Sequence, residues 1–370
     1  MISADVGHIG GVWASEDVSL HDVIAARLRL AKAGAGIGNA YSWTRVLTVV
    51  AITRQQQERL LAKEILMQVS KRFPLTAIII LLEPDADVTR IDAEVSTYTS
   101  NRGTEQAMLM YEAIVLNLKG EVSRHVSSVI RPLVSSDTPV FLWWLKDSYK
   151  EFIVARELVE IALRSLTDTS YSEDPSEALA TMLAFQESFC EKCSIVDLAF
   201  SATQPQRMAL ATAFDIQPLR ISSLVFDQIT VADSGPSTRP FYLAGWLCHS
   251  LGLTPTEKLQ DNDSVRLFSL RSGLGSCTLK ISFDETQNIS PRIGLRGKSD
   301  DSSWTISLLP PKRVDAMGLI RIAEVGGPVY ERPILLKAWT DAEKLESELE
   351  YYGEDKVFSG VLSIARVLAE

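Results

Sequence analysis

Cysteine and histidine are scarce in this chain. Four cysteines, Cys190, Cys193, Cys248 and Cys277, are too few to hold 370 residues together as a disulfide framework. The four histidines are scattered, and none shares a short motif with a nucleophile or a metal ligand. The sequence also contains no G-x-S-x-G, no GxxxxGK and no HExxH motif. The common signatures of hydrolases, nucleotidases and metalloproteases are therefore absent.

Long apolar runs are missing as well. The most apolar stretches, residues 77–82 and 140–145, are far shorter than the ~20 residues that a membrane-spanning helix needs. The N-terminal twenty residues lack a basic segment followed by an apolar one, so the sequence predicts neither secretion nor organelle import. We expect a cytoplasmic protein that does not associate with membranes.

The composition is that of an ordinary globular protein. Hydrophobic residues make up 46% of the chain, charged residues make up 23%, and there are only 15 prolines. This composition excludes a chain that is mainly disordered. The net charge of -10 repels phosphate groups, so a nucleic-acid partner is not expected. A length of 370 residues exceeds a usual domain of ~100 to 200 residues and favours two domains.

Hydrophobic periodicity predicts alternating strands and helices in the first part of the chain and mainly strands later. The expected strands are 45–52, 76–82, 91–98, 108–119, 140–145, 222–231, 265–270, 278–283, 291–296 and 304–309. The expected helices are 17–33, a segment after residue 53, 122–133, 151–166, 176–189, 205–214, 241–251, 340–351 and 356–368. We predict an α/β domain over residues 1–217, with a mixed sheet and flanking helices, and a smaller α+β domain over residues 218–370.

A glycine run and a cysteine pair invite chemical interpretations. Gly34, Gly36 and Gly38 follow a predicted helix and precede a strand, whereas a phosphate loop needs the order strand, glycines, helix. We therefore favour a linker over a phosphate site.

Cys190 and Cys193 lie at a predicted helix C-terminus, where the helix dipole raises the pKa of a thiol. Two ordinary thiols are therefore favoured, and a regulatory disulfide between them stays open as the alternative.

Aromatic residues supply the candidate partner-binding positions. Trp143 and Trp144 end a predicted central strand and point to opposite faces, and Lys146 and Asp147 follow them. Ligands of α/β folds bind at this end of a strand, and exposed tryptophan is a common interface anchor. Packing of both rings in the core is an alternative of at least equal weight. Trp246 is a further candidate anchor, with core packing of its helix as the alternative.

Several segments resemble one known family. They are Thr44–Val50, Arg72–Pro74, Glu112–Leu116, Lys119–Gly120, Thr138–Trp144, Leu243–Leu247 and Gly353–Phe358. In order and spacing they are similar to the glucose-6-phosphate dehydrogenase assembly proteins, the OpcA family of cyanobacteria and actinobacteria. The likeness runs from about residue 40 to the end of the chain.

The resemblance implies a protein that is not itself an enzyme and needs no cofactor. It would bind glucose-6-phosphate dehydrogenase, favour the active oligomer of that enzyme, and thereby open the oxidative pentose phosphate pathway. It further implies redox regulation through thioredoxin, for which Cys190 and Cys193 are the first candidates and Cys248 and Cys277 the second. Two rival functions stay open: a thiol oxidoreductase that uses Cys190 and Cys193, and a sensor that binds a sugar phosphate or nucleotide.

Overall fold

A computed structural model gives the fold of the protein. It describes residues 8–35, 46–100, 108–151, 156–214, 225–273, 275–283, 291–299, 302–311, 317–351, 353 and 355–370. The described contacts divide the chain into two compact units. Unit 1 comprises residues 1–168, 189–196 and 341–354, and unit 2 comprises residues 169–188, 197–340 and 355–370. The predicted domain boundary at residue 217 lies outside the described residues.

Unit 1 is built on an eight-stranded mixed sheet with the strand order β1-β4-β5-β3-β2-β6-β7-β8. Its strands are β1 (His8–Ser15), β2 (Leu47–Thr53), β3 (Leu75–Glu83), β4 (Arg90–Ser100), β5 (Met108–Lys119), β6 (Val140–Trp144), β7 (Arg164–Thr167) and β8 (Ser194–Asp197). Strands β5, β3, β2, β6 and β7 are parallel neighbours, and β4 pairs antiparallel with both β5 and β1. The completely buried strands β2 and β6 form the centre of the sheet, as expected for parallel strands covered on both faces.

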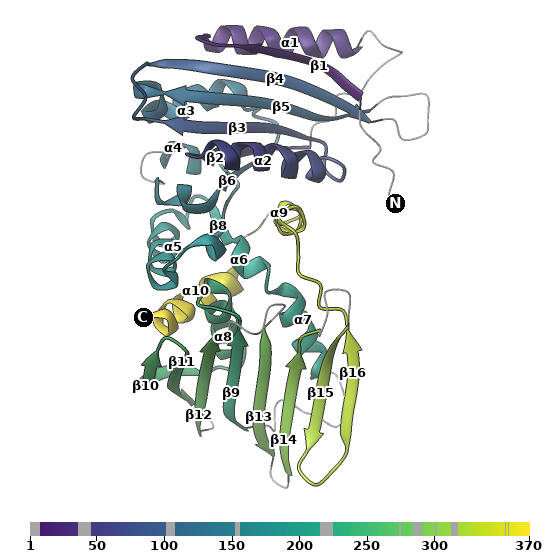
Figure 1. Ribbon diagram of the computed structural model, residues 1–370, viewed down its shortest axis with the longest axis vertical. Coiled ribbons are helices and arrows are strands. Elements are labelled where there is room, and N and C mark those ends of the chain that lie inside the picture. The colour runs from purple at the N-terminus through teal and green to yellow at the C-terminus, as the bar shows by residue number, and fades with distance from the viewer. Residues whose placement is uncertain are drawn as a thin grey trace. The chain divides into compact units, whose positions relative to one another are not determined.

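Helices cover both faces of this sheet. They are α1 (Leu20–Ala35), α2 (Gln56–Val69), α3 (Val126–Ile130), α4 (Arg156–Val159) and α9 (Asp341–Leu349). The Arg27 guanidinium of α1 donates two hydrogen bonds of 2.9 Å to Glu112, whereas Arg59 of α2 donates to Asn117. Residues 112 and 117 alternate to opposite faces of β5, so α1 and α2 lie on opposite sides of the sheet. Figure 1 shows α1 lying along β1 and β4.

One predicted helix of unit 1 is wrong. The sequence predicts a helix over 151–166, but the described part of this segment forms only the short α4 and then β7. Strand β7 is buried throughout and pairs in parallel with β6. The spacing of apolar residues in this segment is typical of a helix. Residues 164–167 form a strand instead, because tertiary packing at the sheet overrides the local preference.

Unit 2 contains a second eight-stranded sheet, with the order β10-β11-β12-β9-β13-β14-β15-β16. Its strands are β9 (Val225–Asp233), β10 (Thr254–Asn262), β11 (Val265–Ser272), β12 (Gly275–Phe283), β13 (Arg292–Ser299), β14 (Ser302–Leu309), β15 (Gly318–Glu324) and β16 (Val329–Ile334). Its helices are α5 (Pro175–Phe189), α6 (Leu198–Ser201), α7 (Gln204–Ala213), α8 (Thr238–Ser250) and α10 (Lys356–Ala369). Except between β9 and β12, the pairs of neighbouring strands run antiparallel.

The predicted fold class is confirmed: both units combine a mixed sheet with helices. The sequence interpretation misses β1, β8, β10, β15 and β16, and most of these are sheet edges or short strands. Within the described residues, no helix is long and apolar enough to cross a membrane.

Candidate functional site

Unit 1 has a topological switch point between β2 and β6. The chain leaves β2 through α2 toward β3 on one side, and it leaves β6 toward β7 on the other. In open α/β sheets the crevice beyond the carboxyl ends of two such strands is the usual ligand site. The side chains at this point decide what kind of ligand it can take.

The chain's own charged side chains fill this position. Glu58 lies in the first turn of α2 and is only 3% exposed. The Thr53 hydroxyl, at the end of β2, donates to the Glu58 carboxylate, and the Lys146 ammonium, just beyond β6, lies 3.2 Å from the other carboxylate oxygen. Lys146 also has a positive φ of 43°, a backbone conformation that is rare for residues other than glycine.

This arrangement differs from a phosphate cradle in charge and in shape. A cradle presents backbone N–H groups of a glycine-rich turn and a helix N-terminus to an anion. Here the Glu58 carboxylate itself takes the favourable place for a negative charge at the N-terminus of α2. A bound phosphate would have to displace that carboxylate or suffer repulsion from it. The pair can hold structure at the switch point, but it does not provide an anion site.

The predicted partner-binding tryptophans of unit 1 are buried. Trp143 is 4% exposed and Trp144 is completely covered, and the Trp144 indole donates a 2.8 Å hydrogen bond to the Ser165 hydroxyl. Burial on both faces of β6 favours core packing over partner binding for these rings. The structure brings Lys146 into the pair with Glu58, and the Asp147 side chain lies outside the described residues.

Trp246 belongs to unit 2, where it is half-buried on α8. The structure gives no site within the described part of either unit that unites it with the other predicted residues. Its role as an anchor therefore stays a prediction. Of the glycine run, Gly34 lies in the last turn of α1, and Gly36 and Gly38 lie outside the described residues.

The cysteines are all free thiols in the structure. Cys190 is exposed just beyond α5, whereas Cys193 is buried and its backbone N–H still bonds to the Phe189 carbonyl. Burial raises the pKa of Cys193 to about 12 and that of Cys248 to about 12, and it raises the pKa of Cys277 to about 11. Since the thiolate is the reactive form, these three buried thiols are poor nucleophiles at neutral pH.

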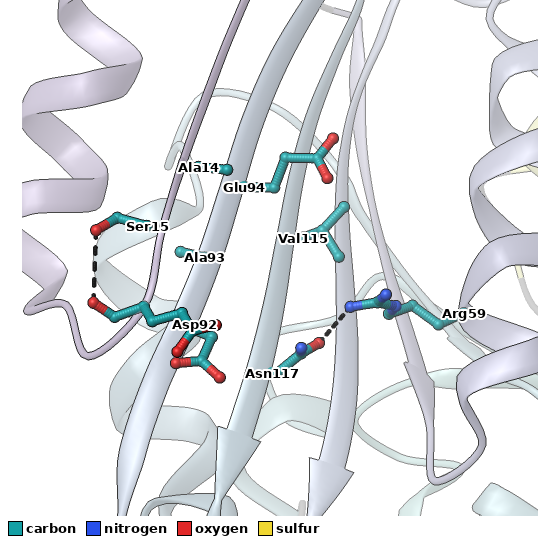
Figure 2. Close-up of a pocket in the computed structure, with 9 residues that line it drawn as sticks. Ala14, Ser15, Arg59, Asp92, Ala93, Glu94, Val115 and Asn117 are labelled. Carbon is teal, nitrogen blue, oxygen red and sulfur yellow. Dashed lines mark hydrogen bonds between the residues drawn. The ribbon is translucent and has the colours of Figure 1, made fainter.

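A cavity of about 310 Å³ opens on the other part of the unit 1 sheet. Figure 2 shows its walls: strands β1, β4 and β5, with Arg59 of α2 reaching toward Asn117 across 2.6 Å. The other lining residues are Ala14, Ser15, Glu16, Asp92, Ala93, Glu94 and Val115. The period-2 pattern of polar residues in 92–98 is the one signal of this face in the sequence. The cavity joins elements that are distant along the chain, so the sequence interpretation misses it.

The carboxylates of this cavity already have partners. Asp92 lies 2.8 Å from Lys119 and 3.0 Å from Arg90, and Glu94 lies beside Lys63. Burial opposes ionisation of Asp92, but the hydrogen bond from Lys119 and the neighbouring cations hold its pKa below the usual range. Among the described residues, no group of three or more histidine, cysteine and acidic side chains could hold a metal ion.

Comparison with known proteins gives one match to a family model. Residues 44–184 match the family model described as "Glucose-6-phosphate dehydrogenase subunit N-terminal domain". A search of curated proteins finds no match.

Solved structures resemble this chain only at low similarity. KijD10, a 3-ketoreductase from Actinomadura kijaniata, in its complex with NADP, is 12% identical with a TM-score of 0.46, and the alignment covers 87% of this chain and 96% of that one. The dehydrogenase MviM from Clostridium difficile is 8% identical with a TM-score of 0.43, covering 87% and 97%. Likenesses at this level carry no conclusion about function.

Proposed function

We propose that the chain is a binding partner of glucose-6-phosphate dehydrogenase, because residues 44–184 match the family model of the glucose-6-phosphate dehydrogenase subunit N-terminal domain. The chain would favour the active oligomer of the enzyme and raise its apparent affinity for glucose 6-phosphate. The family match is the observation that carries the proposal, and it agrees with the resemblance predicted from the sequence.

The mechanism we propose needs no reactive group in this chain. A protein partner shifts its client between two states only by its differential affinity for them. A tenfold shift in the client's equilibrium corresponds to about 1.4 kcal/mol of differential binding, which an interface of ordinary size can supply.

We also propose that the chain does not catalyse a reaction itself. The switch point supports this, because Glu58 and Lys146 pair with each other where a nucleotide-binding enzyme would present a glycine-rich turn. The purified chain should leave the absorbance of NADP with glucose 6-phosphate unchanged in the absence of the dehydrogenase. Reduction of NADP by the chain alone would contradict this part of the proposal.

Sedimentation velocity and substrate-saturation curves of the dehydrogenase, with and without the chain, test the main proposal. We expect a larger enzyme species and a lower half-saturating concentration of glucose 6-phosphate when the chain is present. If neither quantity changes under oxidising or reducing conditions, the proposal is wrong.

Redox control through thioredoxin is a finer part of the same proposal. Cys190 and Cys193 are separated by one turn, and exposed Cys190 is the thiol that an oxidant or thioredoxin could reach first. Mass spectrometry of the oxidised chain should then find these two residues linked, and Cys190→Ser should make activation of the dehydrogenase independent of redox state. Equal redox dependence in that variant would exclude this pair.

A further inference from the structure

The sheet of unit 2 has one face that no described helix of this unit covers. Along its strands, buried apolar residues alternate with half-buried or exposed ones. The buried set is in register across the sheet, as in Ile229, Leu295 and Ile306, and helices α7 and α8 contact the strands that carry it. The alternating set therefore points to the opposite, open face. Figure 1 shows the strands of this sheet lying side by side.

The open face is positively charged, although the whole chain has a net charge of -10. Its cationic side chains are Arg271, Lys280, Arg292, Arg296, Lys298 and Arg321, and they outnumber its acidic ones, which are Asp227 in a bulge of β9 and Glu257 and Glu331 on the edge strands β10 and β16. Asp227 pairs with Arg296 and Lys298, and Glu331 of the edge strand β16 pairs with Arg321. Arg271, Lys280 and Arg292 are exposed and have no ion-pair partner among the described residues.

Short hydroxyl side chains fill the space between these cations. Thr230, Thr278, Ser282, Thr305 and Ser307 occupy the open face of the central strands and are half-buried. Such residues leave the sheet surface flat and able to form hydrogen bonds. A flat polar face with unpaired cations is complementary to a flat surface that carries carboxylates.

The size of the face suits a protein interface. Eight strands at ~4.8 Å spacing and about eight residues at ~3.3 Å each give a face of about 34 by 26 Å, or about 900 Å². A standard interface takes about 800 Å² from each partner. A second copy of the chain is not favoured as the occupant, because a two-fold interface would bring two copies of the same net-positive face together.

We propose that this open face, defined by Arg271, Lys280 and Arg292, is the docking surface for an acidic patch of the partner protein. The inference rests on the proposed function, and the partner is then the glucose-6-phosphate dehydrogenase. A nucleic acid is disfavoured because the remainder of the chain is acidic and would repel its backbone.

The test reverses charge on the open face and compares it with the same change elsewhere in unit 2. Lys280→Glu/Arg292→Glu should weaken binding of the full chain to the purified dehydrogenase by about tenfold or more at low salt. Complementary charges at an interface attract the partner during its approach and fix its orientation in the complex, and the double variant reverses two of them. The weakening should shrink as salt increases. Lys280→Glu alone should weaken binding in the same direction. The single reversal Lys356→Glu, at the exposed start of α10, is its matched control and should change the dissociation constant less than about twofold.

Circular dichroism and urea unfolding check that the variants fold, and Lys280→Gln/Arg292→Gln provides a milder pair that should weaken binding in the same direction. If the wild type and both double variants bind the dehydrogenase equally well, the proposed docking surface is wrong, whereas the proposed partner is still correct. If the wild type shows no binding in either redox state, the proposed function fails and this inference falls with it. Binding of labelled RNA that the charge reversal abolishes would overturn the assignment to a protein partner.

Discussion

At the scale of single residues, burial separates the four cysteines into one reactive and three protected thiols. Cys190 is exposed, whereas burial raises the pKa of Cys193 and Cys248 to about 12 and that of Cys277 to about 11. We expect iodoacetamide at pH 8 to label Cys190 at least tenfold faster than the other three, as measured by mass spectrometry of timed digests. The urea-unfolded chain is the control, because its four cysteines should react at similar rates. Equal labelling in the folded protein would contradict the burial of these thiols.

A buried ion cluster in unit 1 gives a second prediction at this scale. The Lys344 ammonium lies 2.9 Å from Asp168 and 2.6 Å from Asp341, and Lys344 and Asp168 are both buried. Burial alone would lower the pKa of Lys344, but the adjacent carboxylates raise it above its ordinary value. A raised lysine pKa stabilises the fold fully below the unfolded-state value of ~10.4, and this contribution is lost only as the pH rises above that value.

Lys344→Met should therefore lower the free energy of unfolding at pH 7 by about 3–5 kcal/mol, since it leaves the Asp168 carboxylate buried without its cation. Urea unfolding followed by circular dichroism measures the loss. The double variant Lys344→Met/Asp168→Asn should recover part of it, because no uncompensated charge at Asp168 then remains. A single variant that unfolds at the wild-type urea concentration would show that the cluster is not stabilising.

At the scale of elements, the contact between α8 and α10 explains one of the family-like segments. Gly245, in the middle of Leu243–Leu247, lies where α10 passes closely. A Cβ at this position would lie 3.0 Å from the Val361 carbonyl oxygen and 3.2 Å from the Ala365 nitrogen, both backbone atoms of α10. The glycine allows the two helices to approach, so the packing depends on it.

Gly245→Ala sets two effects of similar size against each other. Alanine stabilises the helix by about 1 kcal/mol relative to glycine. The added methyl group would also crowd the backbone of α10, which cannot change rotamer as a side chain can, and such overpacking costs about 1–3 kcal/mol. We expect a net loss of about 1 kcal/mol in the free energy of unfolding, measured with urea. Gly273→Ala is the control, because a Cβ there meets no atom within 4 Å. If Gly245→Ala is more stable than the wild type, the two helices must separate at little cost.

The elements also show how far the sequence could predict this protein. Long segments with a clear period, such as α1, the β4–β5 hairpin and α10, are predicted correctly because each carries its own amphipathic pattern. Strand β7 is mistaken for a helix because its conformation depends on pairing with β6. That pairing partner lies earlier in the chain and does not affect the hydrophobic periodicity of residues 164–167 themselves. The pair of Glu58 and Lys146 could not be foreseen, since 88 positions separate residues that only the strand order brings together.

At the scale of the whole molecule, the chain returns to unit 1 near its end. The segment 341–354 belongs to unit 1 and carries the partners of three of its side chains. Glu348 lies 2.6 Å from buried Arg164, Lys344 lies beside Asp168, and Glu346 lies 3.5 Å from Arg72. A fragment that ends at residue 217 therefore loses the counter-charges of Arg164 and Asp168.

We expect the fragment 1–217 to be much less stable than the same residues in the full chain, because unpaired buried charges cost about 3–5 kcal/mol each time a partner is removed. Hydrogen exchange of the amides in β6 and β7 measures this: their protection in the fragment should fall far below that in the full chain. A synthetic peptide of residues 338–356 should bind the fragment and restore protection, whereas the same peptide with Lys344→Met and Glu348→Gln should restore less. Full protection in the fragment alone would mean that residues 1–217 form a stable domain without α9. Residues 341–354 would then not be a necessary part of unit 1.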